Sequence, residues 1–175
     1  MIPENGGHLD GKAFELSVSS ELLFRGFNCS MPIVDAGIDI LAWKSNHKPF
    51  KVQVKGRNFS GHGTGVESYR FSKSSYENPS TKPDFIVMIL RYTQTARQDS
   101  IYGTVNRIVF PATRFDELVK KGLIVEKGDY FVVNVWAEFT NGVAIKVVFQ
   151  KGYGQPRPGE DMTSFLNAWD VLEKL

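Results

Sequence analysis

Apolar and polar residues alternate most clearly over residues 50–56, FKVQVKG, where the polar positions are Lys51, Gln53 and Lys55. A period of two predicts a β-strand with one apolar and one polar face. A second strand-like run covers residues 37–43, and the short link between the two runs is polar and contains a proline. The pair of runs therefore predicts a β-hairpin.

A tight register for this hairpin pairs Trp43 with Pro49, which places Asp39 opposite Gln53. The other side chains on the face of Asp39 are apolar, so we expect this carboxylate to be partly buried or to lie at the rim of a cleft. A partly buried carboxylate needs a cation, a metal ion or hydrogen bonds. Lys55 on the neighbouring strand can be that partner, either in a structural salt bridge or as part of a site.

Helical spacing of apolar residues precedes the hairpin. It predicts a helix of about sixteen residues, with Asp10 as its N-cap and Gly26 at its end. Apolar side chains fall around most of the circumference, so we expect the rest of the domain to cover this helix largely. They are Phe14, Leu16, Val18, Leu22, Leu23 and Phe24.

The remaining chain predicts a mixed set of elements. Residues 57–83 are rich in glycine, serine and aromatic residues and predict a basic loop with one short helix near residues 73–76. Later elements are strands at 84–92 and 103–110, a short helix within 111–122, a hairpin turning at 140–142 and an amphipathic helix at 161–175. The order indicates one α/β domain over residues 1–175, with a mixed β-sheet flanked by helices and a C-terminal hairpin and helix over 129–175.

Composition supports a globular protein outside the membrane. The chain of 175 residues is 42% hydrophobic and 23% charged, as expected for one soluble domain. The longest apolar run, FIVMIL at residues 85–90, is far too short to cross a membrane. Cys29 is the single cysteine, and the N-terminus lacks the apolar core of a signal peptide, so we expect a reducing, cytoplasmic location.

Charge is distributed unevenly along the chain. Residues 44–82 contain eight Lys/Arg and two Glu, a net charge of +6, whereas the other residues contain thirteen basic and seventeen acidic side chains, a net charge of −4. A basic segment on an otherwise acidic chain indicates a surface that binds a polyanion. The alternative is a set of solvated, lysine-rich loops.

Three stretches together resemble a known nuclease superfamily. They are GKAFELSVSSELLFRGF, DAGIDILAW and FKVQVKG, which span a core motif at residues 11–56. This order is similar to the PD-(D/E)XK superfamily, whose restriction-endonuclease-like fold has an N-terminal helix followed by a catalytic β-hairpin. Its branches include archaeal Holliday-junction resolvases, restriction enzymes and an intron-encoded homing endonuclease.

The resemblance implies a site and an activity. Gly11, Phe14 and Glu15 match the helix motif, Asp39 the acid of the first strand and Lys55 the lysine of the second. It implies a DNA endonuclease that depends on Mg²⁺, or on Mn²⁺. Cutting both strands of a duplex needs two sites related by symmetry, so we expect a homodimer or a higher homo-oligomer. The catalytic residues would be Glu15, Asp39, Gln53 and Lys55, and the metal ligands Asp39, Gln53 and Glu15.

Gln53 departs from the superfamily pattern, which more often has an acid at this position. An amide oxygen can still bind Mg²⁺ but brings no negative charge, and a Gln-x-Lys motif resembles that of the homing-endonuclease branch. A catalytically inactive DNA-binding or assembly module is the alternative, and a protein with no nucleic-acid role is a third. Glu21 lies about 120° around the helix from Glu15, and Asp35 is either an outer ligand or a turn residue.

The segment after the hairpin mixes cations and aromatic rings and predicts DNA contacts. The cations and amide are Lys51, Arg57, Asn58, Arg70 and Lys73, and the rings, which can also pack beneath the loop, are Phe59, Tyr69 and Tyr76. His62 is a further candidate for a role at the substrate. A second basic loop, at residues 151–157, can flank the same groove.

Overall fold

The computed structural model of the protein describes residues 6–32, 37–45, 47–60, 63–93, 104–154 and 156–174. In that part of the chain the strands form two five-stranded sheets. Sheet A has the order β1-β2-β3-β5-β6, made of β1 (Asn28–Ser30), β2 (Ile40–Trp43), β3 (Phe50–Ser60), β5 (Phe85–Thr93) and β6 (Thr104–Pro111). Sheet B has the order β10-β9-β8-β4, and β7 also pairs with β8. Its strands are β4 (Thr64–Ser72), β7 (Ile124–Lys127), β8 (Tyr130–Thr140), β9 (Val143–Gln150) and β10 (Gly159–Asp161).

The first helix, α1 (Gly6–Phe24), begins earlier than predicted. Asp10 therefore lies inside the helix, and its prediction as the N-cap is wrong; its carboxylate contacts side chains of the sheet instead. Gly26 follows the helix with a φ of 79°, a left-handed conformation that glycine adopts at little cost. The predicted end of the helix is confirmed.

The expectation that α1 is covered around most of its circumference is wrong. One stripe at a spacing of four residues, Phe14, Val18 and Leu22, is buried. Leu23 and Phe24 are 57% and 88% exposed. Within the described residues, α1 packs through this stripe, and its other apolar side chains, Leu16 among them, reach solvent.

The predicted first hairpin is present, and its register is confirmed. Ile40 pairs with Val52 and Leu41 with Lys51, which is the register that places Asp39 opposite Gln53. Strand β3 runs parallel to β5, whereas the other pairs of sheet A are antiparallel. The sheet is therefore mixed, as expected.

The prediction of a loop over residues 57–83 is wrong where β3 and β4 form, and it is confirmed for the short helix and for residues 78–83, which belong to no helix or strand. Strand β3 continues to Ser60, and β4 pairs with β8 along its whole length, before α2 (Lys73–Glu77) begins near the expected position. The backbone hydrogen bonds between β4 and β8 join residues that lie more than fifty positions apart in the chain. Glycine-rich and serine-rich composition describes local preference only, and pairing with a distant strand overrides it.

The predicted C-terminal helix at 161–175 is also wrong. Two short 3-10 helices, η1 (Thr163–Phe165) and η2 (Trp169–Lys174), stand there instead. Asn167 separates them with a φ of 50° and donates its backbone N–H to the carbonyl of Arg107, at 2.6 Å. This contact with β6 interrupts the helix that the amphipathic pattern predicted.

The other predicted elements are confirmed. Helix α3 (Ala112–Lys120) follows a proline and ends before Gly122, whose φ is 68°. Strands β8 and β9 form the second hairpin, and its turn contains Asn141 and Gly142, both with positive φ. Among the described residues, no helix has both the length and the apolar character needed to cross a membrane.

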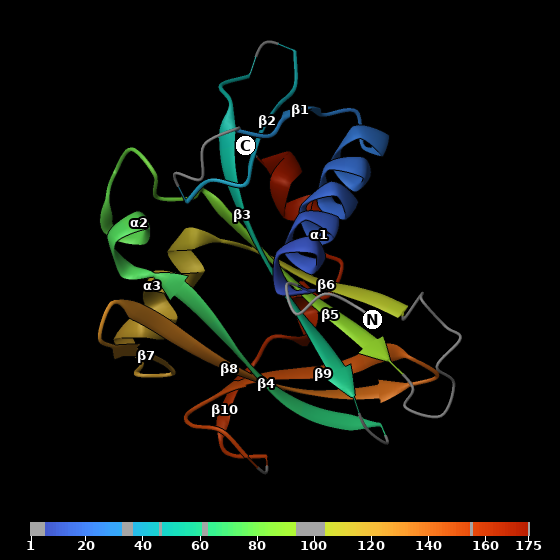
Figure 1. The fold of residues 1–175 in the computed structure, drawn as a ribbon, viewed down its shortest axis with the longest axis vertical. Coiled ribbons are helices and arrows are strands. Elements are labelled where there is room, and N and C mark those ends of the chain that lie inside the picture. The colour runs from blue at the N-terminus through green and yellow to red at the C-terminus, as the bar shows by residue number, and fades with distance from the viewer. Residues whose placement is uncertain are drawn as a thin grey trace.

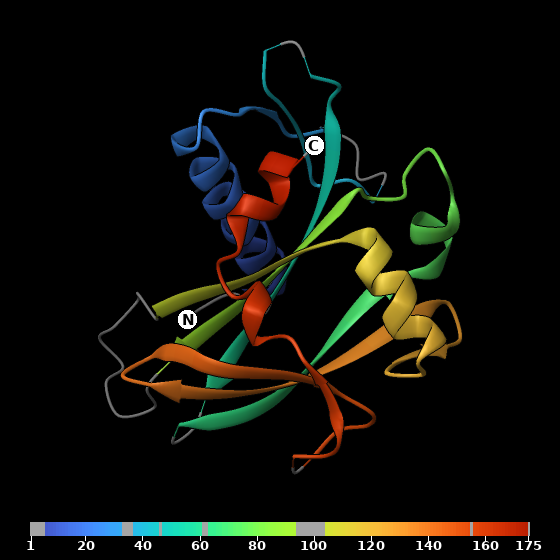
Figure 2. The same ribbon diagram turned by 180° about the vertical axis from the view of Figure 1, so that it is seen from behind.

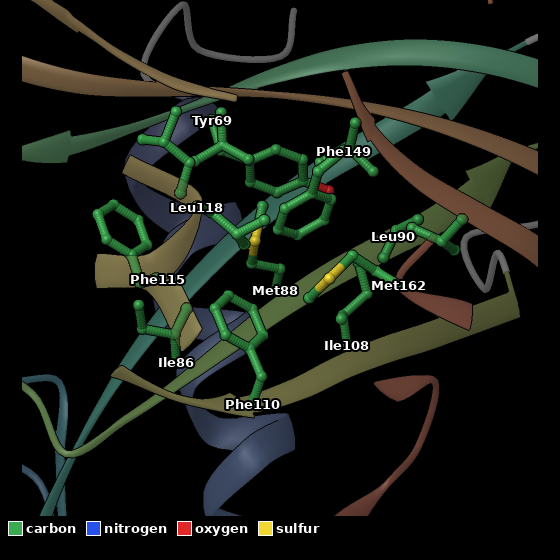
Figure 3. Packing of buried hydrophobic residues seen from close by; sticks show 14 of the residues in the cluster. Tyr69, Ile86, Met88, Leu90, Ile108, Phe110, Phe115, Leu118, Phe149 and Met162 are labelled. Carbon is green, nitrogen blue, oxygen red and sulfur yellow. The ribbon is translucent and has the colours of Figure 1, made fainter. Parts of the chain in front are cut away.

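The core has two halves on either side of sheet A. In β5, Phe85, Val87 and Ile89 belong to a cluster with α1 and η2, whereas the alternating residues belong to a cluster with sheet B. Figures 1 and 2 show α1 on one side of sheet A and the strands of sheet B on the other. Figure 3 shows Ile86, Met88, Tyr69 and Phe149 among the side chains of the second cluster. Because both faces of β5 are buried, its sequence is a continuous apolar run and does not alternate.

Candidate active site

The four residues predicted as catalytic line one open pocket of about 570 Å³. Glu15 belongs to α1, and Gln53 and Lys55 belong to β3. Asp39 directly precedes β2. The wall opposite the hairpin is formed by β4 and α2. The structure therefore brings side chains from a helix and two strands together around one hollow.

Asp39 is held in place by backbone hydrogen bonds across the hairpin. Its Oδ2 accepts the N–H of Val54 at 2.6 Å, and its own N–H donates to the carbonyl of Val52 at 3.1 Å. Gly37, two residues earlier, has a φ of 81°, and a Cβ there would lie 2.5 Å from the Cβ of Ser75. Only glycine fits this approach of the chain to α2, so the hairpin reaches Asp39 along a defined path.

Glu15 is positioned by the way α1 packs on β3. The ring of Phe14 fills the space beside Gly56, where an added Cβ would lie 2.0 Å from a ring carbon. Glu15 itself forms an ion pair with Lys12, whose Nζ lies 2.5 Å from Oε2. Glu21, the alternative helix acid, does not line this pocket and pairs with Arg25 at 2.8 Å.

Gln53 and Lys55 project from the same face of β3, as predicted. Gln53 is only 3% exposed, whereas Lys55 is half-buried at the pocket. In the described part of the chain, no group of three or more His, Cys, Asp and Glu residues is placed to hold a metal ion. An ion here would need the amide oxygen of Gln53 beside the two carboxylates; oxygen donors of this kind suit Mg²⁺, so the residues present fit that ion.

A third carboxylate in the pocket was missed by the sequence reasoning. Asp10 lines the same hollow, and its Oδ2 accepts a hydrogen bond from Asn58 Nδ2 at 3.4 Å. Arg91 Nη1 lies 3.9 Å from its other oxygen. The sequence spacing could have predicted this position. Asp10 lies about one helical turn before Phe14, the residue that packs on the sheet, so both side chains lie on the same face of α1.

Three of the residues predicted to contact DNA line the pocket: Arg57, Asn58 and Arg70. Arg57 Nε donates to the carbonyl of Ser68 at 2.9 Å, which ties β3 to β4. Burial raises the pKa of the neighbouring Glu67, and the Arg57 charge opposes that rise. This part of the wall therefore carries one arginine from each strand and the amide of Asn58 from β3.

Lys51 and Lys73 do not line the pocket. Lys51 Nζ donates to the carbonyls of Pro79 and Ser80, at 3.2 and 3.5 Å. Lys73 Nζ lies 2.5 Å from Glu126, and this hydrogen bond raises the pKa of the lysine. Their roles in DNA binding stay predictions.

The three rings considered as base-stacking groups are buried in the core. Tyr69 is 1% exposed and donates to the carbonyl of Ile89 at 2.9 Å. Tyr76 donates to the carbonyl of Ala112, and its burial, together with Asp116, raises its pKa. Phe59 packs on Phe139. Stacking of bases on these rings is therefore excluded, because neighbouring strands and, for Tyr76, Phe115 of α3 cover them. His62 and Asp35 lie outside the described residues.

The folded chain is similar to solved structures of two nucleases, and at their low sequence identity this similarity shows the fold alone. The bacterial homing endonuclease I-Ssp6803I is similar over 95% of this chain and 93% of its own, with a TM-score of 0.53 and 15% identity. Hjc, a Holliday junction resolvase from the archaeal hyperthermophile Archaeoglobus fulgidus, matches 70% of this chain and 82% of its own, with a TM-score of 0.40 and 15% identity. No protein-family model and no curated protein matches the sequence. The expected restriction-endonuclease-like α/β fold is confirmed.

Proposed function

We propose that the protein is a Mg²⁺-dependent DNA endonuclease that hydrolyses phosphodiester bonds. The observation that carries the proposal is the meeting of Glu15, Asp39, Gln53 and Lys55 in one open pocket. This pocket lies in a chain whose fold is similar to that of a homing endonuclease. Two carboxylates, an amide and a lysine beside a basic wall form a set that can bind and cleave a polyanion.

The proposed roles follow from the chemistry of each group. Asp39, Glu15 and the Gln53 amide oxygen would hold the ion, which when bound lowers the pKa of a water and offsets charge on the phosphate oxygens. Lys55 orients the attacking water or stabilises negative charge that develops on the phosphate. Arg57, Asn58 and Arg70 bind neighbouring phosphates and align the strand in the pocket.

Substitution of Lys55 or Asp39 tests the assignment. We expect Lys55→Ala and Asp39→Asn each to lower the rate of plasmid cleavage in Mg²⁺ or Mn²⁺ by about 100-fold or more, the scale of one preorganised electrostatic group. Asparagine keeps an oxygen that can accept from Val54, so Asp39→Asn removes charge while the hairpin contact is retained. Cleavage is measured on plasmid, junction and single-stranded DNA.

Lys120→Ala is the matched control, since Lys120 is an exposed lysine on α3 that does not line the pocket. It should cleave at the wild-type rate. Cleavage by Lys55→Ala at the rate of Lys120→Ala would overturn the assignment. A crystal soaked in Mn²⁺ gives a second readout, because the proposal requires metal density between Asp39 and Gln53.

A binding module without catalysis is the second candidate, and Gln53 is the observation that favours it. With an amide in place of an acid, the pocket has less negative charge to hold an ion. DNA binding that is tight and weakened by salt, without cleavage in either metal, would support this candidate and contradict the first.

A further inference from the structure

A second groove, on the outer face of sheet B, begins where the candidate active site ends. Arg70 lines both the pocket of about 570 Å³ and this neighbouring groove of about 330 Å³. The groove, called here the outer groove, is lined by Ser68, Arg70, Lys127, Tyr130, Val132, Asn134, Gly152 and Tyr153. One arginine therefore borders both hollows, and a chain leaving the first can enter the second past its guanidinium.

The outer groove has the charge of a polyanion-binding surface. Arg70 and Lys127 are the charged residues among the described lining, which contains no Asp or Glu. Both cations are exposed. Phosphates are therefore attracted without the repulsion that a carboxylate in the wall would cause.

Exposed aromatic rings distinguish this groove from the pocket. Tyr130 is 46% exposed and Tyr153 is 62% exposed. Tyr153 also lines a further hollow of about 270 Å³, whose described lining residues include Trp136 and are all uncharged. Each base of an unpaired strand has a flat face that can stack on such rings, whereas paired bases inside a duplex cover theirs.

The loop that carries Tyr153 is held in a defined position. The buried amide of Gln150 donates to the carbonyls of Gly152 and Gly154, at 3.3 and 3.4 Å. Its oxygen accepts the backbone N–H of Arg157 at 3.0 Å. The ring of Tyr153 is thus presented over the groove by a loop tied at both ends to one buried side chain.

We infer that the outer groove binds an unpaired single-stranded DNA segment continuous with the strand held in the active-site pocket. The phosphates of that segment contact Arg70 and Lys127, and its bases stack on Tyr130 and Tyr153. The inference rests on the proposed function and specifies its substrate class: DNA with a tail, flap or fork next to the cut. The groove is accessible for this at its four exposed lining residues, Arg70, Lys127, Tyr130 and Tyr153.

Binding of two DNA probes in EDTA tests the inference. One probe is a blunt duplex, and the other is the same duplex with a single-stranded tail of about ten nucleotides, within the usual site size of a single-strand groove. We expect the wild-type protein to bind the tailed probe more tightly, as measured by fluorescence anisotropy. Tyr153→Ala should lower affinity for the tailed probe by about 5-fold or more, the lower end of one base stack, and leave the blunt probe unchanged.

Matched variants separate the ring and the charge from the fold. Tyr153→Phe keeps the ring and should keep the preference for the tail. Lys127→Ala should reduce the salt slope for the tailed probe by about one, whereas Lys120→Ala, which removes the same charge outside both hollows, should not. Arg70→Ala should weaken binding of both probes, because Arg70 lines both hollows.

Equal wild-type affinity for the two probes, or binding to neither, overturns the inference. A Tyr153→Ala variant that weakens both probes equally overturns it as well, since the ring would then serve duplex binding or folding. Plasmid cleavage by the same wild-type preparation is scored separately. Cleavage without a preference for the tail removes the inference alone, and a preference for the tail without cleavage removes the proposed nuclease alone.

Discussion

Gln53 is the residue at which this pocket differs most from the acid-rich sites of the superfamily that the sequence resembles. It is 3% exposed and stands opposite Asp39 in the hairpin register. An amide in this position is neutral, so the strand folds without burying a second charge. The same neutrality would leave an ion at this position with one carboxylate ligand fewer.

Gln53→Glu is expected to strengthen metal binding and to weaken the metal-free fold. A buried carboxylate is costly without a compensating cation, so the melting temperature in EDTA should fall. Mg²⁺ should restore it, and half-maximal cleavage should occur at a lower Mg²⁺ concentration. Thermal unfolding and cleavage across a Mg²⁺ titration measure both effects.

Gln150→Glu is the control for this prediction, because Gln150 is a fully buried glutamine far along the chain. It should lower the melting temperature without recovery in Mg²⁺. Equal recovery in both variants would show a general ionic effect and contradict the assignment of Gln53 as a ligand.

At the scale of elements, the contact between α1 and β3 decides where Glu15 lies. Gly56 has no side chain, and the ring of Phe14 occupies the space beside it. Arg91 lies over the other part of this contact, with its guanidinium 5.8 Å from the ring centre of Phe14. The helix and the strand carrying Lys55 therefore meet at one closely packed point.

Gly56→Ala is expected to push α1 away from β3 and to lower the free energy of unfolding by about 1–3 kcal/mol, the usual cost of overpacking. Cleavage should fall as well, because Glu15 moves with the helix. Denaturant unfolding and plasmid cleavage measure the two effects. Gly11→Ala is the matched control for stability: a Cβ on this helical glycine meets nothing within 4 Å, so it should stabilise by roughly 0.5–1 kcal/mol. A Gly56→Ala protein as stable as wild type would contradict the packing argument.

Over the whole molecule, the folded chain balances much of the charge that the sequence segregates. Lys73 pairs with Glu126, and Lys82 with Asp116 at 2.8 Å. Both acids lie outside the basic segment of residues 44–82. Of the other cations in that segment, Lys55, Arg57 and Arg70 line the pocket, and Arg70 also lines the outer groove.

A cut through both strands of a duplex in one binding event uses two active sites, which a symmetric dimer supplies, so we expect a homodimer. Sedimentation velocity at the concentration of the cleavage assay should give a mass of about twice 19.7 kDa. A DNA-bound sample gives the second measurement, since two chains per duplex are expected. A single chain of 19.7 kDa in both samples would contradict the prediction.

The sequence by itself determined the parts of the site that depend on local pattern. Alternation over residues 50–56 and a short turn specify the hairpin register, because each side chain of a strand points opposite to its neighbour and the turn sets the pairing. The resemblance added Glu15, and the folded helix brings it to the same pocket as Lys55.

The tertiary structure alone decided which distant segments meet. Strand β4 exists because β8 supplies its hydrogen bonds, from Thr64 with Glu138 to Ser72 with Tyr130. That pairing buries Tyr69, turns Arg70 outward and joins the pocket to the outer groove. The composition near residue 70 could not predict this strand. Its partner lies some sixty residues further along the chain, and the free energy of strand pairing depends on the side chains of both strands.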